Sequence, residues 1–262
     1  MRPTWSGAVS FGLVNIPVQM YSASQEKGGL KFHLLHEKDM SPVGYAKVCK
    51  TEGVEIPPDE IVRAYEYEKG QYVVVTEEDF GRANARKTKT IEILDFACAD
   101  EIDSVYFEKP YYLAPDKGAD KPYALLLETL RRSNKVGIAK FVLRDRESLG
   151  IIKPSGNVLV LNQARFGSEV RDASTLKLPE VEVGSLEREL EMAESLVDRM
   201  TVPFNPTAYR DTYTEELRRT IESKTNGLTP TEKLEEPAAA EVRDLMAVLK
   251  ASLEEAPTRA VA

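Results

Sequence analysis

Residues 9–21 read VSFGLVNIPVQMY, and the alternation of apolar and polar side chains changes register halfway along this stretch. Apolar residues stand at odd positions up to Leu13 and at even positions from Ile16 onward. Successive side chains of a strand point to opposite faces, so the slip moves the apolar set to the other side. We expect a β-bulge or sharp bend at a barrel corner, eased by Gly12, with Pro17 at an unpaired or edge position. The bend would place Phe11 and Leu13 on one buried face and Ile16, Val18 and Met20 on the next.

Similar strand patterns recur through the first 165 residues, separated by short turns. Residues 30–36 and 43–49 alternate weakly, and residues 71–76 and 90–97 are β-branched or alternating. Two apolar runs around Pro154-Ser155-Gly156-Asn157 predict a hairpin. Helices interrupt the strands only at residues 76–86, where Thr76 and Asp79 resemble a capping box, and at residues 120–135, with Asp120 as N-cap. The pattern predicts a mixed α+β fold dominated by strands, with an antiparallel β-barrel rather than βαβ units.

The periodicity becomes helical after about residue 180. Residues 184–200 carry an apolar stripe with Ser185 as N-cap, and residues 204–227 carry a second stripe that stops at Asn226-Gly227. A linker follows, and then a last amphipathic helix, whose apolar line includes Val242. We therefore expect a core over residues 1–227, and a linker with a C-terminal helix and a disordered end over residues 228–262.

The charge of the chain is acidic overall and basic in two places. The net charge of −8 by itself argues against a nucleic-acid partner, because phosphate binding requires clustered Lys and Arg. However, Arg82–Lys89 holds four basic residues and no acid, and Arg131–Arg146 holds six basic residues and one acid. Each run is either a solvated face or part of a basic groove on an otherwise acidic protein.

Signs of catalytic or metal chemistry are few. His33 and His36 are the only histidines, and in a strand their rings would diverge, so we expect no metal site. Phosphate-binding loops, dinucleotide-binding loops and nucleophile elbows are missing from the sequence, so we expect neither an enzyme nor a cofactor. Two cysteines, no membrane-length apolar segment and no secretory signal together lead us to expect a cytoplasmic protein without a disulfide framework.

Many blocks of the sequence, in order, resemble bacterial Ku. They include WSGAVSFGLVNIPVQMYSA, HLLHEKD, VVVTEEDF, KTIEILDF, IDSVYFEKPYYLAPDKGADKPYALL, GIAKFVLRDRESLGIIKP, NVLVLNQARFGSEVRD, ELEMAESLVDRMTVPFNPTAYRDTY and DLMAVLKASLE. The resemblance spans residues 1–255. It implies a homodimeric ring that threads onto ends of double-stranded DNA, near the nucleoid. Each subunit would have a β-barrel, a strand-rich arm over the DNA and dimerisation helices. The resemblance also implies a role in non-homologous end joining and recruitment of an ATP-dependent DNA ligase.

The resemblance also suggests which residues carry each role. A ring that slides on any sequence contacts phosphates rather than bases, and the two basic runs are candidates for its lining. For DNA binding we select Lys31, Lys47, Lys50, Arg63, Arg82, Arg86, Lys87 and Lys89. Dimerisation is expected to use Tyr209, Tyr213, Leu217 and Ile221, and ligase docking Leu245, Met246, Leu249 and Leu253. Packing of these helices on their own chain is the alternative in both cases.

Three departures from the bacterial Ku pattern affect these expectations. Cys49 stands in CKTE, where many relatives carry a CxxC pair, and Gln19 stands where relatives often carry a cation. The chain ends in EEAPTRAVA rather than in a lysine-rich tail, so we expect binding close to DNA ends with less inward threading. Two other function classes stay open: a β-barrel interaction scaffold that binds no DNA, and a DNA-processing nuclease.

Overall fold

The computed structural model describes residues 1–25, 30–83, 89–144, 146–179, 187–227 and 245–255. The chain divides into two compact units. The first consists of Met1–Gly28 and Phe32–Ala173, and the second of Gly29–Lys31 and Ser174–Ala262. The boundary that we expect between residues 227 and 228 stays a prediction.

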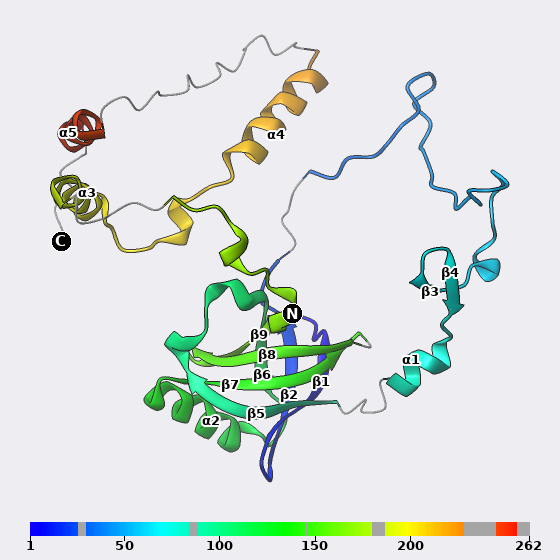
Figure 1. Cartoon of the computed structure of the whole chain (residues 1–262), viewed down its shortest axis with the longest axis horizontal. Coiled ribbons are helices and arrows are strands. Elements are labelled where there is room, and N and C mark those ends of the chain that lie inside the picture. Colours follow the sequence, from blue (N-terminus) through cyan, green and yellow to red (C-terminus); the bar gives the residue numbers. More distant parts are fainter. Residues whose placement is uncertain (26–29, 84–88, 145, 180–186, 228–244, 256–262) are drawn as a thin grey trace. The chain divides into compact units, whose positions relative to one another are not determined.

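A closed seven-stranded barrel forms the centre of the first unit (Figure 1). Its strands run in the order β1-β2-β6-β9-β8-β7-β5. Their bounds are β1 Trp5–Phe11, β2 Val14–Ser22, β5 Thr90–Cys98, β6 Phe107–Pro115, β7 Lys135–Leu143, β8 Arg146–Ser155 and β9 Val158–Ala164. Every neighbouring pair is antiparallel except β1 and β5, which are parallel. An odd number of strands cannot alternate direction all the way round a closed barrel, so one parallel pair is required.

The slip in residues 9–21 is a hairpin turn, which corrects the expected bulge. Phe11 of β1 pairs with Val14 of β2, so only Gly12 and Leu13 connect the two strands. Gly12 has a φ of 55°, in the left-handed region that glycine adopts most easily. Leu13 lies at the tip and is fully exposed, so it belongs to no buried face. The change of register thus marks the end of one strand and the start of the next.

The second half of this stretch behaves as predicted. Ile16, Val18 and Met20 are fully buried in the barrel core. Pro17 faces Ala8 of β1, whereas pairing of β2 with β6 begins only at Val18, so the missing N–H of the proline interrupts no ladder bond there.

Helix α2, Asp120–Ser133, closes one end of the barrel. Tyr123, Leu126, Leu127 and Leu130 are buried in the same cluster as the barrel interior. The Tyr123 hydroxyl donates to the carbonyl oxygen of Leu113 at 2.6 Å and accepts the amide of Leu159 at 2.8 Å. Burial raises the pKa of this hydroxyl. The N-cap residue is Ala119, so the prediction of Asp120 as N-cap was wrong by one position.

The chain between β2 and β5, residues 23–89, is called the arm, and its described residues 23–25, 30–83 and 89 have little regular structure. It contains the hairpin of β3, Ala64–Glu68, and β4, Gln71–Val74, followed by α1, Glu77–Ala83. The expected strands at 30–36 and 43–49 are wrong, because these segments form only the isolated bridges Leu35–Pro42 and Val48–Glu55. Side chains there are nearly all exposed, so burial in a core does not stabilise a strand in these segments. The predicted cap of α1 is confirmed: Thr76 and Asp79 exchange hydrogen bonds.

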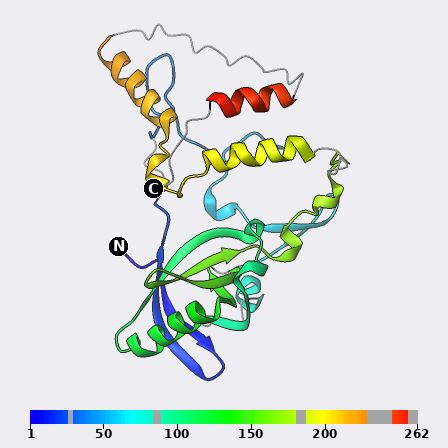
Figure 2. The same cartoon turned by 90° about the vertical axis from the view of Figure 1, so that its left-hand side faces the viewer.

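The second unit contains three described α-helices (Figure 2). They are α3, Glu187–Met200, α4, Thr212–Thr225, and α5, Leu245–Glu255. Helices α3 and α5 pack against each other, and Arg199 donates to the carbonyl oxygen of Leu253 at 2.9 Å. Described 3₁₀ turns elsewhere in the chain are Pro58–Glu60, Ala99–Glu101, Ser104–Tyr106, Gly167–Glu169, Ala173–Thr175 and Pro206–Ala208. Two predicted residues lie outside the described part of the chain: Ser185, the expected N-cap of α3, and Val242, from the apolar line of the last helix.

Candidate nucleic-acid interface

The barrel has an open end opposite α2, where all its connections to the rest of the chain begin. Trp5 of β1 pairs with Met20 near the end of β2, and Leu143 at the end of β7 pairs with Arg146 at the start of β8. The arm leaves this end after Ser22 and rejoins it at Thr90, because β1 and β5 run in parallel. Both attachments of the arm are therefore on the β1, β2 and β5 side of the barrel.

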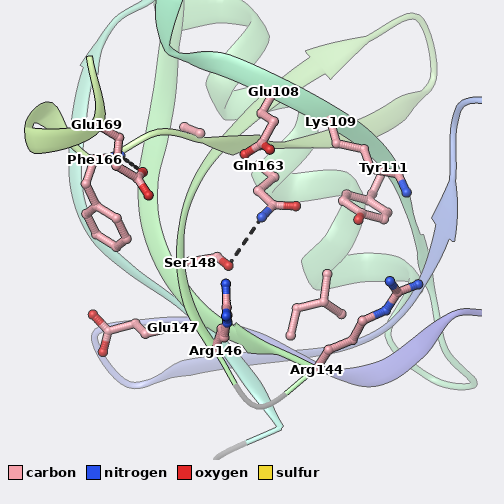
Figure 3. A pocket seen from close by; sticks show the side chains of 12 residues that line it. Glu108, Lys109, Tyr111, Arg144, Arg146, Glu147, Ser148, Gln163, Phe166 and Glu169 are labelled. Atoms are coloured by element: carbon pink, nitrogen blue, oxygen red, sulfur yellow. Dashed lines mark hydrogen bonds between the residues drawn. The ribbon is translucent and has the colours of Figure 1, made fainter. Parts of the chain in front are cut away.

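A polar pocket of about 460 Å³ lies at the open end (Figure 3). Three cations line it: Lys109 of β6, Arg144 of the β7–β8 turn and Arg146 of β8. Figure 3 shows Lys109 and Arg144 on one side of the pocket, with Glu147 and Glu169 on the other. Glu108 of β6 also lines the pocket, at its top in Figure 3, and Arg146 lies beside Glu147. The side with Lys109 and Arg144 is therefore the basic one.

The carboxylates on the acidic side already have partners. Glu147 forms an ion pair with Lys140 on the neighbouring strand at 2.8 Å. Glu169 accepts the amide of Phe166 at 2.8 Å. By contrast, Lys109, Arg144 and Arg146 form no ion pair within the described part of the chain. Their positive charges are available to an external anion.

A smaller cleft of about 170 Å³ adjoins the basic side of the pocket. We call it the basic cleft, and its lining residues are Thr4, Trp5, Ser22, Lys109, Tyr111, Leu143 and Arg144. It contains two cations, three hydroxyl groups and no carboxylate. The Thr4 hydroxyl already donates to the carbonyl oxygen of Met20, and the Ser22 hydroxyl to that of Ser24. The Lys109 ammonium lies 5.6 Å from the centre of the Tyr111 ring, which holds the cation in place. Two cations with no carboxylate beside them are suited to bind phosphate.

Arg144 adopts a strained backbone conformation to reach the basic cleft. Its φ is 50°, in the left-handed region that costs a non-glycine residue about 1 kcal/mol. Glycine or asparagine would fit this turn with less strain. Leu143 pairs with Arg146, so Arg144 is the first residue of a two-residue hairpin turn, and such turns require a positive φ there.

The predicted DNA-binding residues of the arm lie in different surroundings. Lys31, Lys47 and Lys50 are exposed and belong to no helix or strand. Arg63 and Arg82 instead approach carboxylates of their own chain. Arg63 lies 3.2 Å from Glu77 and 5.4 Å from the centre of the Phe80 ring, and Arg82 lies 3.7 Å from Glu78 and 3.9 Å from Asp79.

The last part of the Arg82–Lys89 run returns to the barrel. The carbonyl oxygen of Lys89 accepts the amide of Ala8 at 2.9 Å, so Lys89 belongs to the open end. Arg86 and Lys87 lie outside the described residues. Among the predicted residues that the structure describes, Lys89 is the one that adjoins the barrel, beside β1. Three cations that were not selected line the pocket at the open end.

A family sequence model described as "Ku: Ku70/Ku80 beta-barrel domain" matches residues 10–192, more than half of the chain. The chain belongs to the Ku family. Similar curated proteins are each named "Non-homologous end joining protein Ku". That of Opitutus terrae is 45% identical over 97% of this chain and 91% of its own length. That of Pseudomonas aeruginosa is 42% identical, covering 96% and 88%, and that of Bacillus subtilis is 37% identical, covering 97% and 82%.

The expected dimerisation stripe of this Ku chain is shorter than predicted. Helix α4 begins at Thr212, so Tyr209 precedes it and stacks on Phe204 at 6.1 Å between ring centres. The 3₁₀ turn at Pro206–Ala208 separates Tyr209 from the helix. Tyr213 is 73% exposed, and Leu217 and Ile221 are half-buried. An exposed tyrosine beside two half-buried aliphatic residues leaves α4 with an apolar face to cover.

The predicted ligase-docking residues lie on α5, which packs against α3. Met246, Leu249 and Leu253 are half-buried there, and the side chain of Leu245 lies outside the described part. Helix α3 keeps an exposed apolar strip beyond this contact, with Val197 63% and Met200 65% exposed. Packing on the same chain, the alternative considered above, therefore occupies part of the α5 face.

Other features of this Ku chain bear on the remaining expectations. Gln19 donates to the Asp116 carboxylate at 3.3 Å and accepts the Tyr21 hydroxyl at 2.6 Å, so an uncharged amide bonded to an acid stands at this position. Hydrogen bonds from the amides of Glu52 and Thr51 lower the pKa of the Cys49 thiol. The described residues contain no cluster of three or more potential metal ligands. Within the same residues, no helix has the length and apolar character to cross a membrane.

Proposed function

We propose that this chain binds ends of double-stranded DNA without reading their sequence and acts in non-homologous end joining. Membership of the Ku family, whose relatives carry that name, is the observation that carries the proposal. The basic cleft supports it, because its two cations lack carboxylate partners among the described residues and stand where the arm leaves the barrel. The role needs no catalytic residue.

The phosphate backbone is the feature that the proposed site would contact. The basic cleft offers the positive charges of Lys109 and Arg144, which suit phosphate oxygens of any sequence. Base readout requires a helix or β-ribbon in the major groove, and the cleft presents neither. Arg146 and Lys89 would extend the basic surface around the open end. An acidic exterior would repel DNA elsewhere, and the net charge of −8 is consistent with that.

A homodimer is part of the proposal, because the resemblance to bacterial Ku implies a ring of two subunits around the DNA. The exposed face of α4 around Tyr213 would supply the apolar contact. Helix α5, or the exposed strip of α3 beside it, would recruit an ATP-dependent DNA ligase. The place of action would be the bacterial cytoplasm, at the nucleoid.

A gel-shift experiment with linear and closed circular duplexes of the same sequence tests the proposal. We expect the linear duplex alone to be bound, both DNAs to stay intact with and without divalent metal, and binding to weaken steeply with salt. Failure to bind either DNA would favour the scaffold class. Metal-dependent degradation would favour the nuclease class, and equal binding of both DNAs would remove the requirement for ends.

A further inference from the structure

One edge of β5 lacks a strand partner over half of its length. The parallel pairing of β1 with β5 covers only Ala8–Ser10 and Thr90–Glu92. Strand β5 then continues to Cys98, paired with β7 on its other side. No described strand occupies the first side from Ile93 onward. An unpaired strand edge is a template for the backbone of another extended segment.

Beside this edge lies an apolar pocket of about 420 Å³. Phe11 at the end of β1 and Phe96 of β5 meet edge to face, with ring centres 6.2 Å apart. Leu126 and Leu130 of α2 are buried beneath it. In both overall views the tip of the β1–β2 hairpin extends beyond the barrel at the end that α2 occupies (Figures 1 and 2). The pocket therefore lies where β1 separates from β5.

Apolar side chains of β5 and α2 around this pocket are exposed to solvent, although the barrel core is adjacent. Phe96 is 45% exposed, Leu125 of α2 is 68% exposed and Leu94 of β5 is 48% exposed. Contiguous exposed apolar groups on a folded protein mark an interaction site. Side chains that alternate along an added strand would reach the pocket at every second position.

The charge at the pocket indicates the chemistry of the occupant. Lys135 is the only charged residue in its lining, and it is exposed with no ion pair to any described residue. Two neighbouring arginines of α2 share one carboxylate, because Glu128 binds both Arg131 and Arg132 at 2.7 Å, so this group keeps one net positive charge. An apolar side chain followed by a carboxylate therefore complements this surface.

We propose that the free edge of β5 and the apolar pocket bind an extended peptide segment of another protein, with an apolar anchor followed by an acidic residue. A second copy of this chain is a poorer occupant. A pocket of about 420 Å³ is in the size range of sites that hold a small ligand or a few side chains, whereas a stable dimer requires a contact that buries about 1,200 Å² or more. The surface lies at the α2 end, away from the open end, so peptide binding and the proposed DNA binding are independent of each other.

The probe is a synthetic peptide whose sequence comes from a random display library selected against the full chain. We expect the selected sequences to alternate apolar and other residues and to end in Asp or Glu. A labelled consensus peptide should bind about tenfold more weakly, or worse, to Leu125→Arg, which changes an exposed helix residue and leaves the core intact. Peptides with Lys in place of the acids should bind Lys135→Glu better than they bind the unchanged chain.

Controls separate this surface from the rest of the protein. Lys117→Glu changes an exposed cation that does not line the pocket, and peptide binding should persist. On peptide binding, amide hydrogen exchange should slow at residues 93–97. Selected peptides that bind Leu125→Arg unchanged, or exchange that stays the same at these amides, would overturn the proposal. So would a fall in the sedimentation mass of Leu125→Arg, because a second copy would then occupy the pocket.

Discussion

Replacing both cations of the basic cleft tests the assignment of the DNA interface most directly. We consider the double change Lys109→Gln and Arg144→Gln, which keeps side chains of similar length and removes two positive charges. Neither charge forms an ion pair with a described carboxylate, so their loss leaves no acid newly unpaired. Strain at Arg144 comes from its backbone, and glutamine keeps it.

The expected magnitude follows from the number of charges. Each phosphate contact contributes about 0.9 to the slope of log K against log salt, so the slope should become shallower by about 1.8 per subunit. Near physiological ionic strength that corresponds to about 1 kcal/mol per contact. Together the two losses should weaken binding about thirtyfold per subunit.

Fluorescence anisotropy with a blunt linear duplex, measured at several salt concentrations, gives both the affinity and the slope. Lys117→Gln is the matched control, because it removes one exposed lysine near α2 rather than at the open end. Circular dichroism would check that each variant is folded. If the double variant binds with the slope of the unchanged chain, the basic cleft contacts no phosphate and the assignment is refuted.

Three further predictions concern stability and assembly. Tyr123→Phe should lower the free energy of unfolding by about 1–3 kcal/mol in urea titrations, because it leaves a buried amide without an acceptor. Burial raises the Tyr123 pKa above its usual 10.0, so the unfolded chain loses this proton first as pH rises. The difference in free energy of unfolding between the unchanged chain and Tyr123→Phe should therefore become smaller above about pH 10. A difference that stays constant with pH would contradict this. Gly7→Ala should lower the melting temperature, because its Cβ would collide with the Lys89 carbonyl oxygen that helps to close the barrel, whereas Gly44→Ala meets open space and should not. Tyr213→Lys should shift sedimentation toward monomer, and an unchanged mass would remove α4 from the proposed dimer contact.

Local patterns predicted the barrel wherever neighbouring strands are joined by short turns. The hairpin at Gly156 is confirmed, with Ser155 pairing with Val158 and a φ of 53° at the glycine. The slip at Gly12 was detected but assigned to a bulge, because a bulge and a two-residue turn change the register of side chains in the same way. Only the pairing of Phe11 with Val14 separates the two.

The candidate site was harder to predict because it is assembled from distant parts of the chain. Lys109 stands between aromatic residues of β6, and Arg144 occupies a turn that follows β7. The basic run Arg131–Arg146 includes Arg144, but no charge pattern in the sequence indicated Lys109. Their meeting depends on strand order, which a single sequence does not reveal. Charge runs in the arm were easier to see, and two of those arginines have carboxylate neighbours.

The short ladder between β1 and β5 has a consequence for how the arm can vary. It joins residues 8–10 to residues 90–92. Closing the barrel therefore requires only that the two ends of the arm come together, whatever lies between them. The entropy lost in closing such a loop grows with the logarithm of its length, by about 0.6 kcal/mol for each doubling. Evolution can therefore lengthen, shorten or replace the arm at little thermodynamic cost to the barrel. The length of the arm and the stability of the barrel that carries it can therefore change independently in this architecture.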